Sequence, residues 1–79
     1  MKVGDRFTLP SGRQALLTVS AVPSRPWQAV ENGWRWAVVR EHGIAGRPSV
    51  SFYFGGEARP IDLDEADARA LAAALNAVG

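Results

Sequence analysis

Turn signals divide the first 63 residues of this 79-residue chain into short segments. The strongest of these signals are Pro10-Ser11-Gly12, Asn32-Gly33 and Gly55-Gly56. Each turn has β-branched and aromatic residues on both sides, and Asn-Gly between such residues is the strongest short hairpin signal. The two longer connections, 23–26 and 41–48, are too short to hold a helix that crosses between parallel strands. The sequence therefore predicts an antiparallel sheet built from three hairpins.

We expect about five or six short strands in an antiparallel β-meander. Their expected ranges are 5–9, 14–22, 27–31, 34–40, 49–54 and 57–63. A two-residue turn at Asn32-Gly33 gives one face of its hairpin Trp27, Trp34, Trp36 and Val38. A two-residue turn at Gly55-Gly56 gives the core-facing side of its hairpin Val50, Phe52, Phe54, Ile61 and Leu63. In the first hairpin, Leu16 and Leu17 are adjacent, and either of them can face the core.

A helix is expected after Leu63, because residues 65–78 contain seven alanines and neither glycine nor proline. Alanine is the best helix former, and Asp64 is a suitable N-cap for a helix that starts with acidic residues. At helical spacing Leu71, Leu75 and Val78 share one face, which should pack against the sheet. The predicted fold is a single α+β domain over 1–79, with one C-terminal helix on one face of the meander.

Composition excludes several classes of site. The chain has no cysteine and one histidine, so it has no disulfide, no thiolate zinc site and no cysteine nucleophile. Its net charge of +1 argues against a strong nonspecific polyanion binder. No apolar run is long enough for a membrane-spanning helix, and residues 1–7 lack the apolar core of a signal peptide. We therefore expect a cytoplasmic protein that needs no cofactor.

Catalytic constellations are weak in this sequence. His42 is the one imidazole, and no nucleophile-elbow motif accompanies the nearby Ser49 and Ser51. Four carboxylates crowd the expected strand end and helix start: Asp62, Asp64, Glu65 and Asp67. Capping and the helix dipole explain these groups better than acid–base catalysis or a metal site does. The sequence predicts no enzyme activity and no metal site.

Arginine interleaved with tryptophan is the most suggestive functional pattern. Trp34 and Arg35 lie beside the expected turn, while Arg25 and Arg47 lie in or near the two long connections. Tryptophan and arginine are enriched at protein-interface hot spots, and the same pair of residue types binds single-stranded nucleic acid through stacking and phosphate contacts. We predict these four residues as a partner-binding site. A host protein is the first candidate partner, and nucleic acid is the alternative.

A stripe of small residues lies on the expected helix between its apolar face and its polar strip. Its members are Ala66, Ala70, Ala73 and Ala77. Helix propensity alone can explain them, but the stripe would also let the backbone of a second subunit approach closely. Because so small a core supplies only about 3–5 kcal/mol, we expect a homodimer. The helix stripe is one candidate interface, and the apolar sheet face with Val30, Val39 and Tyr53 is the other.

The C-terminal residues VSFYFGGEARPIDLDEADARALAAALNAV (50–78) resemble a pattern of small phage and actinobacterial proteins. The pattern is a closing hairpin, a Leu-Asp helix start and A-x-x-L-A-x-A-L. The resemblance implies an accessory protein of a phage or mobile element that contacts a host factor. The order of sheet and then helix is also similar to the transcriptional-coactivator family that binds single-stranded DNA as a dimer. That family's lysine-rich strands have no counterpart here, since Lys2 is the one lysine.

Overall fold

The computed structural model describes residues 1–44, 47–54 and 62–79, which form an α+β fold with two antiparallel sheets and one helix. The elements are β1 (Arg6–Thr8), β2 (Gln14–Leu16), β3 (Trp27–Asn32), β4 (Arg35–Ile44), β5 (Arg47–Phe52) and α1 (Glu65–Asn76). β1 and β2 form a two-stranded sheet, and the other strands form a second sheet in the order β3-β4-β5. The predicted class is confirmed, but two sheets replace the single meander.

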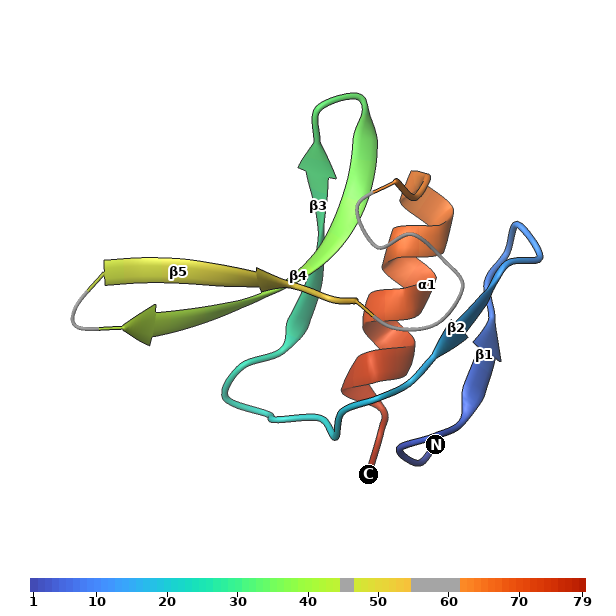
Figure 1. The fold of residues 1–79 in the computed structure, drawn as a ribbon, viewed down its shortest axis with the longest axis horizontal. Helices are drawn as coiled ribbons and strands as arrows, with labels where there is room; N and C mark the ends of the chain where they lie inside the picture. Colours follow the sequence, from blue (N-terminus) through green and yellow to red (C-terminus); the bar gives the residue numbers. More distant parts are fainter. Residues whose placement is uncertain (45–46, 55–61) are drawn as a thin grey trace.

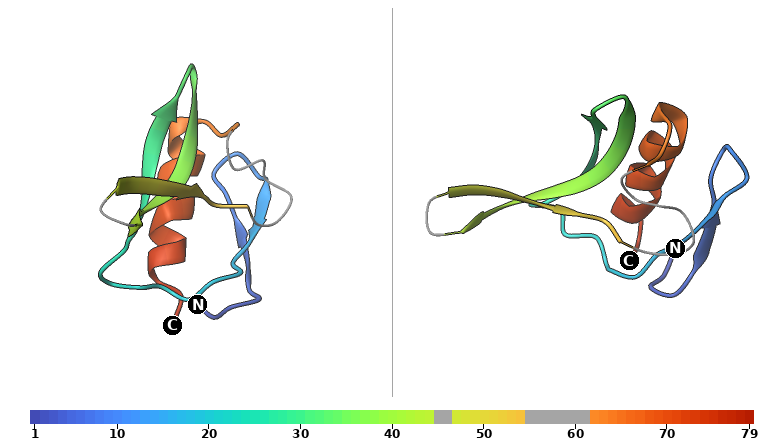
Figure 2. Two further views of the ribbon diagram at one scale, coloured as in Figure 1. Left: turned by 60° about the vertical axis from the view of Figure 1, so that its left-hand side comes forward. Right: turned by 45° about the horizontal axis from the view of Figure 1, so that its top comes forward.

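The helix α1 lies between the two sheets (Figures 1 and 2). The β3–β4 pair covers one side of α1, and the β1–β2 hairpin covers the other. Leu71 and Leu75 are buried in the core together with Leu9 and Leu17 from the first hairpin region. The side chain of Ala68 is also fully buried. Small residues on α1 therefore let both sheets approach the helix closely.

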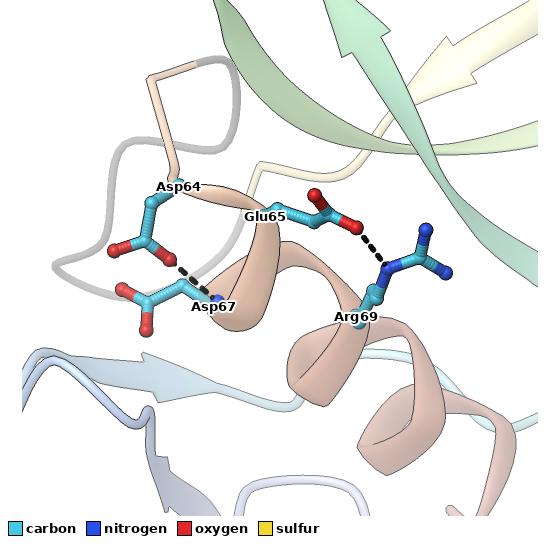
Figure 3. A network of polar contacts seen from close by, with 4 residues as sticks. All are labelled: Asp64, Glu65, Asp67 and Arg69. Atoms are coloured by element: carbon cyan, nitrogen blue, oxygen red, sulfur yellow. Dashed lines mark hydrogen bonds and ion pairs between the residues drawn. The ribbon is translucent and has the colours of Figure 1, made fainter.

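The helix boundaries follow the sequence closely. Asp64 is the N-cap, and its Oδ1 accepts a hydrogen bond of 2.7 Å from the backbone N–H of Asp67 (Figure 3). The helix ends at Asn76, two residues before the predicted end, while Val78 remains buried. Among the described residues, no helix is long and apolar enough to cross a membrane.

A buried carboxylate ties the first hairpin to the helix. Asp67 is 1% exposed, although the sequence analysis explained it only by helix capping and the helix dipole. Its carboxylate accepts hydrogen bonds from the backbone N–H of Ser11, at 3.0 Å, and from the Ser11 hydroxyl. A buried carboxylate needs such donors to offset its lost hydration. The turn between β1 and β2 is thereby attached to the first turn of α1.

The first hairpin is shorter than predicted. The second strand ends at Leu16 instead of residue 22. Leu17 is then fully buried and Leu16 is half-buried, which settles the ambiguity between these neighbours. The backbone leaves the sheet here because the next residues form contacts elsewhere: the N–H of Thr18 donates to the Tyr53 hydroxyl, and the N–H of Ala21 donates to the Val78 carbonyl.

The hairpin near Asn32-Gly33 is confirmed, but its register differs from the prediction by two residues. Asn32 pairs with Arg35, so Gly33 and Trp34 form the two-residue loop. Gly33 has a φ of +68°, and glycine at the first loop position is typical of a type II′ turn. Because a shift of two residues preserves strand alternation, Trp36 and Val38 keep the face that the sequence assigned to them.

The predicted third hairpin, 49–54 with 57–63, is contradicted at its end, where Leu63 pairs with Trp36, and most of its second strand lies outside the described residues. Strand β5 pairs with the extended second half of β4, from Val39 opposite Phe52 to Ile44 opposite Arg47. Much of the region that we expected to be a long loop, 41–48, therefore belongs to paired strands, and hydrogen bonds between the strands satisfy its backbone groups. Residues 55–61, including the Gly55-Gly56 turn and Ile61, lie outside the described residues. Leu63 forms an isolated antiparallel β-bridge with Trp36.

The faces of β5 are the reverse of the prediction. Tyr53 is 2% exposed and belongs to the core, whereas Phe54 is 73% exposed and Val50 is 50% exposed. The Tyr53 ring packs edge-on against Trp27, with ring centroids 5.4 Å apart. Its hydroxyl donates to the Leu16 carbonyl and accepts the Thr18 N–H at 3.2 Å. A tyrosine that satisfies its hydroxyl in this way can be buried, and alternation then turns its neighbours outward.

We expect Gly33→Val to lower the free energy of unfolding by about 1–2 kcal/mol, because a β-branched residue resists a positive φ. No atom lies within 4 Å of a Cβ built at Gly33, so the cost comes from backbone conformation alone. Gly33→Asn is the control and should cost less, since asparagine tolerates this region. Urea unfolding measures both variants. A valine variant with wild-type stability would contradict the turn conformation.

We expect Tyr53→Phe to lower the free energy of unfolding by about 1–3 kcal/mol, because it leaves the Leu16 carbonyl and the Thr18 N–H without their partner. The aromatic contact with Trp27 is retained in this variant. Phe54→Tyr, on the exposed neighbouring residue, is the control and should change stability by less than about 0.5 kcal/mol. Equal stabilities of the two variants would show that the hydroxyl is not structural.

Candidate partner-binding surface at the β3–β4 hairpin

The tip of the β3–β4 hairpin presents an exposed tryptophan. Trp34 occupies the second loop position, and it is 93% exposed. The paired residues Asn32 and Arg35 hold the loop on both sides. The hairpin tip lies at the top of the ribbon in Figure 1, away from β5. One of the three tryptophans is therefore displayed to solvent on a turn held by paired strands.

Arg35 accompanies this indole and is itself held by a carboxylate. Its guanidinium carbon lies 6.0 Å from the centroid of the Trp34 ring, within cation–π range. Its Nε lies 3.2 Å from Asp62 Oδ1, and both side chains are about half exposed. The backbone carbonyl of Asp62 also accepts a hydrogen bond of 3.2 Å from Arg13. The charge of Arg35 is thus balanced locally.

A second arginine–tryptophan pair lies on the helix-facing side of the same hairpin. The Arg69 guanidinium is 5.3 Å from the centroid of the half-buried Trp36 ring. Its Nε forms an ion pair of 2.8 Å with Glu65, one helical turn earlier (Figure 3). The i,i+4 spacing was visible in the sequence, whereas nothing in the sequence linked Arg35 to Asp62 or Arg69 to Trp36. These contacts required the fold.

The other two predicted partner-binding residues lie elsewhere. Arg25 is exposed in the turn before β3, at the opposite end of that strand from Trp34. Arg47 begins β5 opposite Ile44, at the opposite end of β4 from Arg35. A ten-residue strand such as β4 spans roughly 30 Å at its usual rise per residue. Of the four residues, the structure brings together Trp34 and Arg35 alone.

Arg40, which we did not include in the predicted binding site, stacks on a tryptophan of the core. Its guanidinium lies 4.3 Å from the centroid of the buried Trp27 ring. Its Nε and Nη2 are buried, and no acceptor contacts them among the described residues. The stacking places Arg40 against the core face of the sheet and away from the hairpin tip.

The carboxylates considered as catalytic residues have structural partners, and the His42 side chain lies outside the described structure. Asp64 caps the helix, Asp67 binds Ser11, and Asp62 and Glu65 pair with arginines. His42 lies in β4 opposite Ser49, and its side chain is outside the described part of the structure. Within the described ranges, no group of three or more potential metal-ligating residues is clustered.

The alanine stripe of α1 faces solvent for most of its length. Ala66, Ala73 and Ala77 are exposed, and Ala70 is half-buried. The alanines that meet the two sheets are different ones, namely Ala68, Ala72 and Ala74. The stripe is accessible to a second subunit, and its use as a dimer interface stays a prediction.

Comparison with known proteins finds no matching family model, no matching curated protein and no matching solved structure. The resemblances noted in the sequence therefore stay predictions.

We expect Trp34→Ala to change the free energy of unfolding by less than about 0.5 kcal/mol, because the indole is almost fully exposed. Trp27→Ala is the contrasting variant. It removes a buried indole that touches Tyr53 and Arg40, and it should cost about 3–5 kcal/mol. Thermal or urea unfolding separates the two. A large loss of stability in Trp34→Ala would show that this indole supports the fold instead of a partner site.

Proposed function

We propose that the protein is a non-enzymatic binding module that contacts another protein through the β3–β4 hairpin tip. The observation that supports this proposal most is the 93% exposure of Trp34 on a turn fixed by paired strands. Tryptophan buries a large area with little loss of conformational entropy, which makes it a frequent hot-spot residue. An indole displayed in this way gains most from a partner with an apolar pocket.

The charges around Trp34 favour a protein over a nucleic acid. Arg35 is paired with Asp62, and Arg69 is paired with Glu65. A nucleic-acid surface gains affinity from cations that are free to replace counterions along the phosphates. Here each guanidinium already has a carboxylate beside it, and those carboxylates would repel phosphates. A protein partner with mixed charges meets no such repulsion.

The wider setting of this function follows from the sequence predictions. The resemblance of residues 50–78 to phage and actinobacterial proteins suggests a host factor as the partner. We propose that the protein acts in the cytoplasm. We also propose that the module is a homodimer.

The proposal is tested by capturing partners from host lysate with immobilised wild type, Trp34→Ala and Arg35→Ala. We expect a protein retained by wild type at about 0.5 M salt to be lost with Trp34→Ala and weakened with Arg35→Ala, because an apolar anchor resists screening. Val22→Ala is the matched control, since Val22 is an exposed apolar residue outside the hairpin. Binding that survives both hairpin substitutions would place the site elsewhere.

The nucleic-acid alternative is tested with the same variants and a fluorescent 20-nucleotide oligo(dT). We expect negligible binding at 0.15 M salt. Tight binding that depends on Trp34 and falls steeply between about 50 and 200 mM salt would overturn the proposal in favour of a single-strand binder.

A further inference from the structure

The outer edge of β5 carries backbone groups that no described element pairs. β5 is the last strand of its sheet. The Tyr53 N–H donates to the Val38 carbonyl at 2.9 Å, so the backbone polar groups of Tyr53 face β4. Because these groups alternate along a strand, those of Val50 and Phe52 point away from β4. Such an edge is a template for another strand.

The opposite edge of the sheet is treated differently. At the start of β3, the Asn76 side chain accepts from the Trp27 N–H at 2.8 Å and donates to the Trp27 carbonyl at 3.0 Å. The amide thus pairs with the edge strand as a neighbouring peptide group would. Comparable protection of Val50 and Phe52 is absent among the described residues, which leaves β5 as the edge open to pairing.

Apolar side chains accompany the open edge. Phe54 and Val50 are 73% and 50% exposed, and the Phe54 ring lies 6.5 Å from the Phe52 ring. Because side chains alternate along a strand and Tyr53 points inward, Val50, Phe52 and Phe54 lie on the outer face of the sheet. An exposed apolar group beside unpaired backbone is a pairing surface, because a neighbouring strand satisfies both at once.

We propose that this edge pairs with β5 of a second copy, in antiparallel alignment about a two-fold axis, to join two three-stranded sheets. Residues 48–54 carry no charge, so two copies meet without like charges facing each other. An isologous pairing sets Val50, Phe52 and Phe54 against the same residues of the second copy. Pro48 has no N–H, which favours pairing over the later residues.

The proposal rests on the proposed homodimer, for which it names the interface, and it is independent of the proposed hairpin-tip contact, since Trp34 and Arg35 form a different surface. It also differs from the helix-stripe interface, because β5 and the exposed alanines belong to separate elements. One strand pair is a small contact beside the roughly 800 Å² per partner of a standard interface, so we expect a weak dimer.

Sedimentation velocity of the whole protein from about 10 µM to 1 mM tests the pairing. We expect wild type to pass from monomer to dimer over this range. Val50→Lys/Phe54→Lys should stay monomeric and folded, because both side chains are exposed in the monomer and lysine discourages edge pairing. Ala70→Glu/Ala73→Glu should still dimerise. A dimer lost in the alanine variant and kept in the lysine variant would assign the interface to α1 and overturn the proposal.

A backbone variant tests the edge without added charge. Val50→Pro removes an N–H that the monomer does not use, so it should keep the monomer folded and abolish the dimer. Ser51→Pro is the matched contrast. The Ser51 N–H faces β4 opposite Arg40, so its loss should destabilise the monomer itself. A wild type that remains monomeric at 1 mM, or a Val50→Pro variant that still dimerises, would overturn the proposal.

Discussion

The burial of Tyr53 is the constraint on which the arrangement of this small protein depends. Its hydroxyl binds the backbone at Leu16, the last residue of β2, and at Thr18, while its N–H pairs with Val38 in β4. One residue therefore joins the two sheets and also sets which face of β5 is inside. Because successive strand residues alternate, the cost of burying one polar ring includes exposing the apolar residues on either side of it.

The helix completes the connection between the sheets. Asp67 binds Ser11 in the first hairpin, Asn76 binds Trp27 in the second sheet, and both side chains come from α1. These polar contacts specify where each sheet lies on the helix, while Leu71 and Leu75 supply the buried apolar area. In a core of this size, buried hydrogen bonds with satisfied partners contribute to a single arrangement as well as to stability.

The surfaces that remain follow from this interior. Trp27 is buried in the core and Trp36 packs against it, whereas Trp34 is exposed to solvent. The same holds for Val50 on β5 and for Phe54 just after it, which the inward position of Tyr53 excludes from the core. The proposed partner contact and the proposed strand-paired dimer would use these two groups of exposed residues separately, so a single small chain can offer both surfaces.

By itself the sequence determined the local features of this protein. These include the α+β class, the Asp64 cap, the helix start, the Asn32-Gly33 turn region and the buried face with Leu71 and Leu75, because each depends on residues close together in the chain. It also grouped Trp34 with Arg35 as candidate binding residues, and the structure places these two side chains together. The tertiary structure decided the pairing of β5 with β4, the inward side of Tyr53 and the Arg35–Asp62 contact. Alternation along a strand does not decide which of its two faces is buried. That choice depends on partners distant in the chain, here Leu16, Thr18 and Trp27.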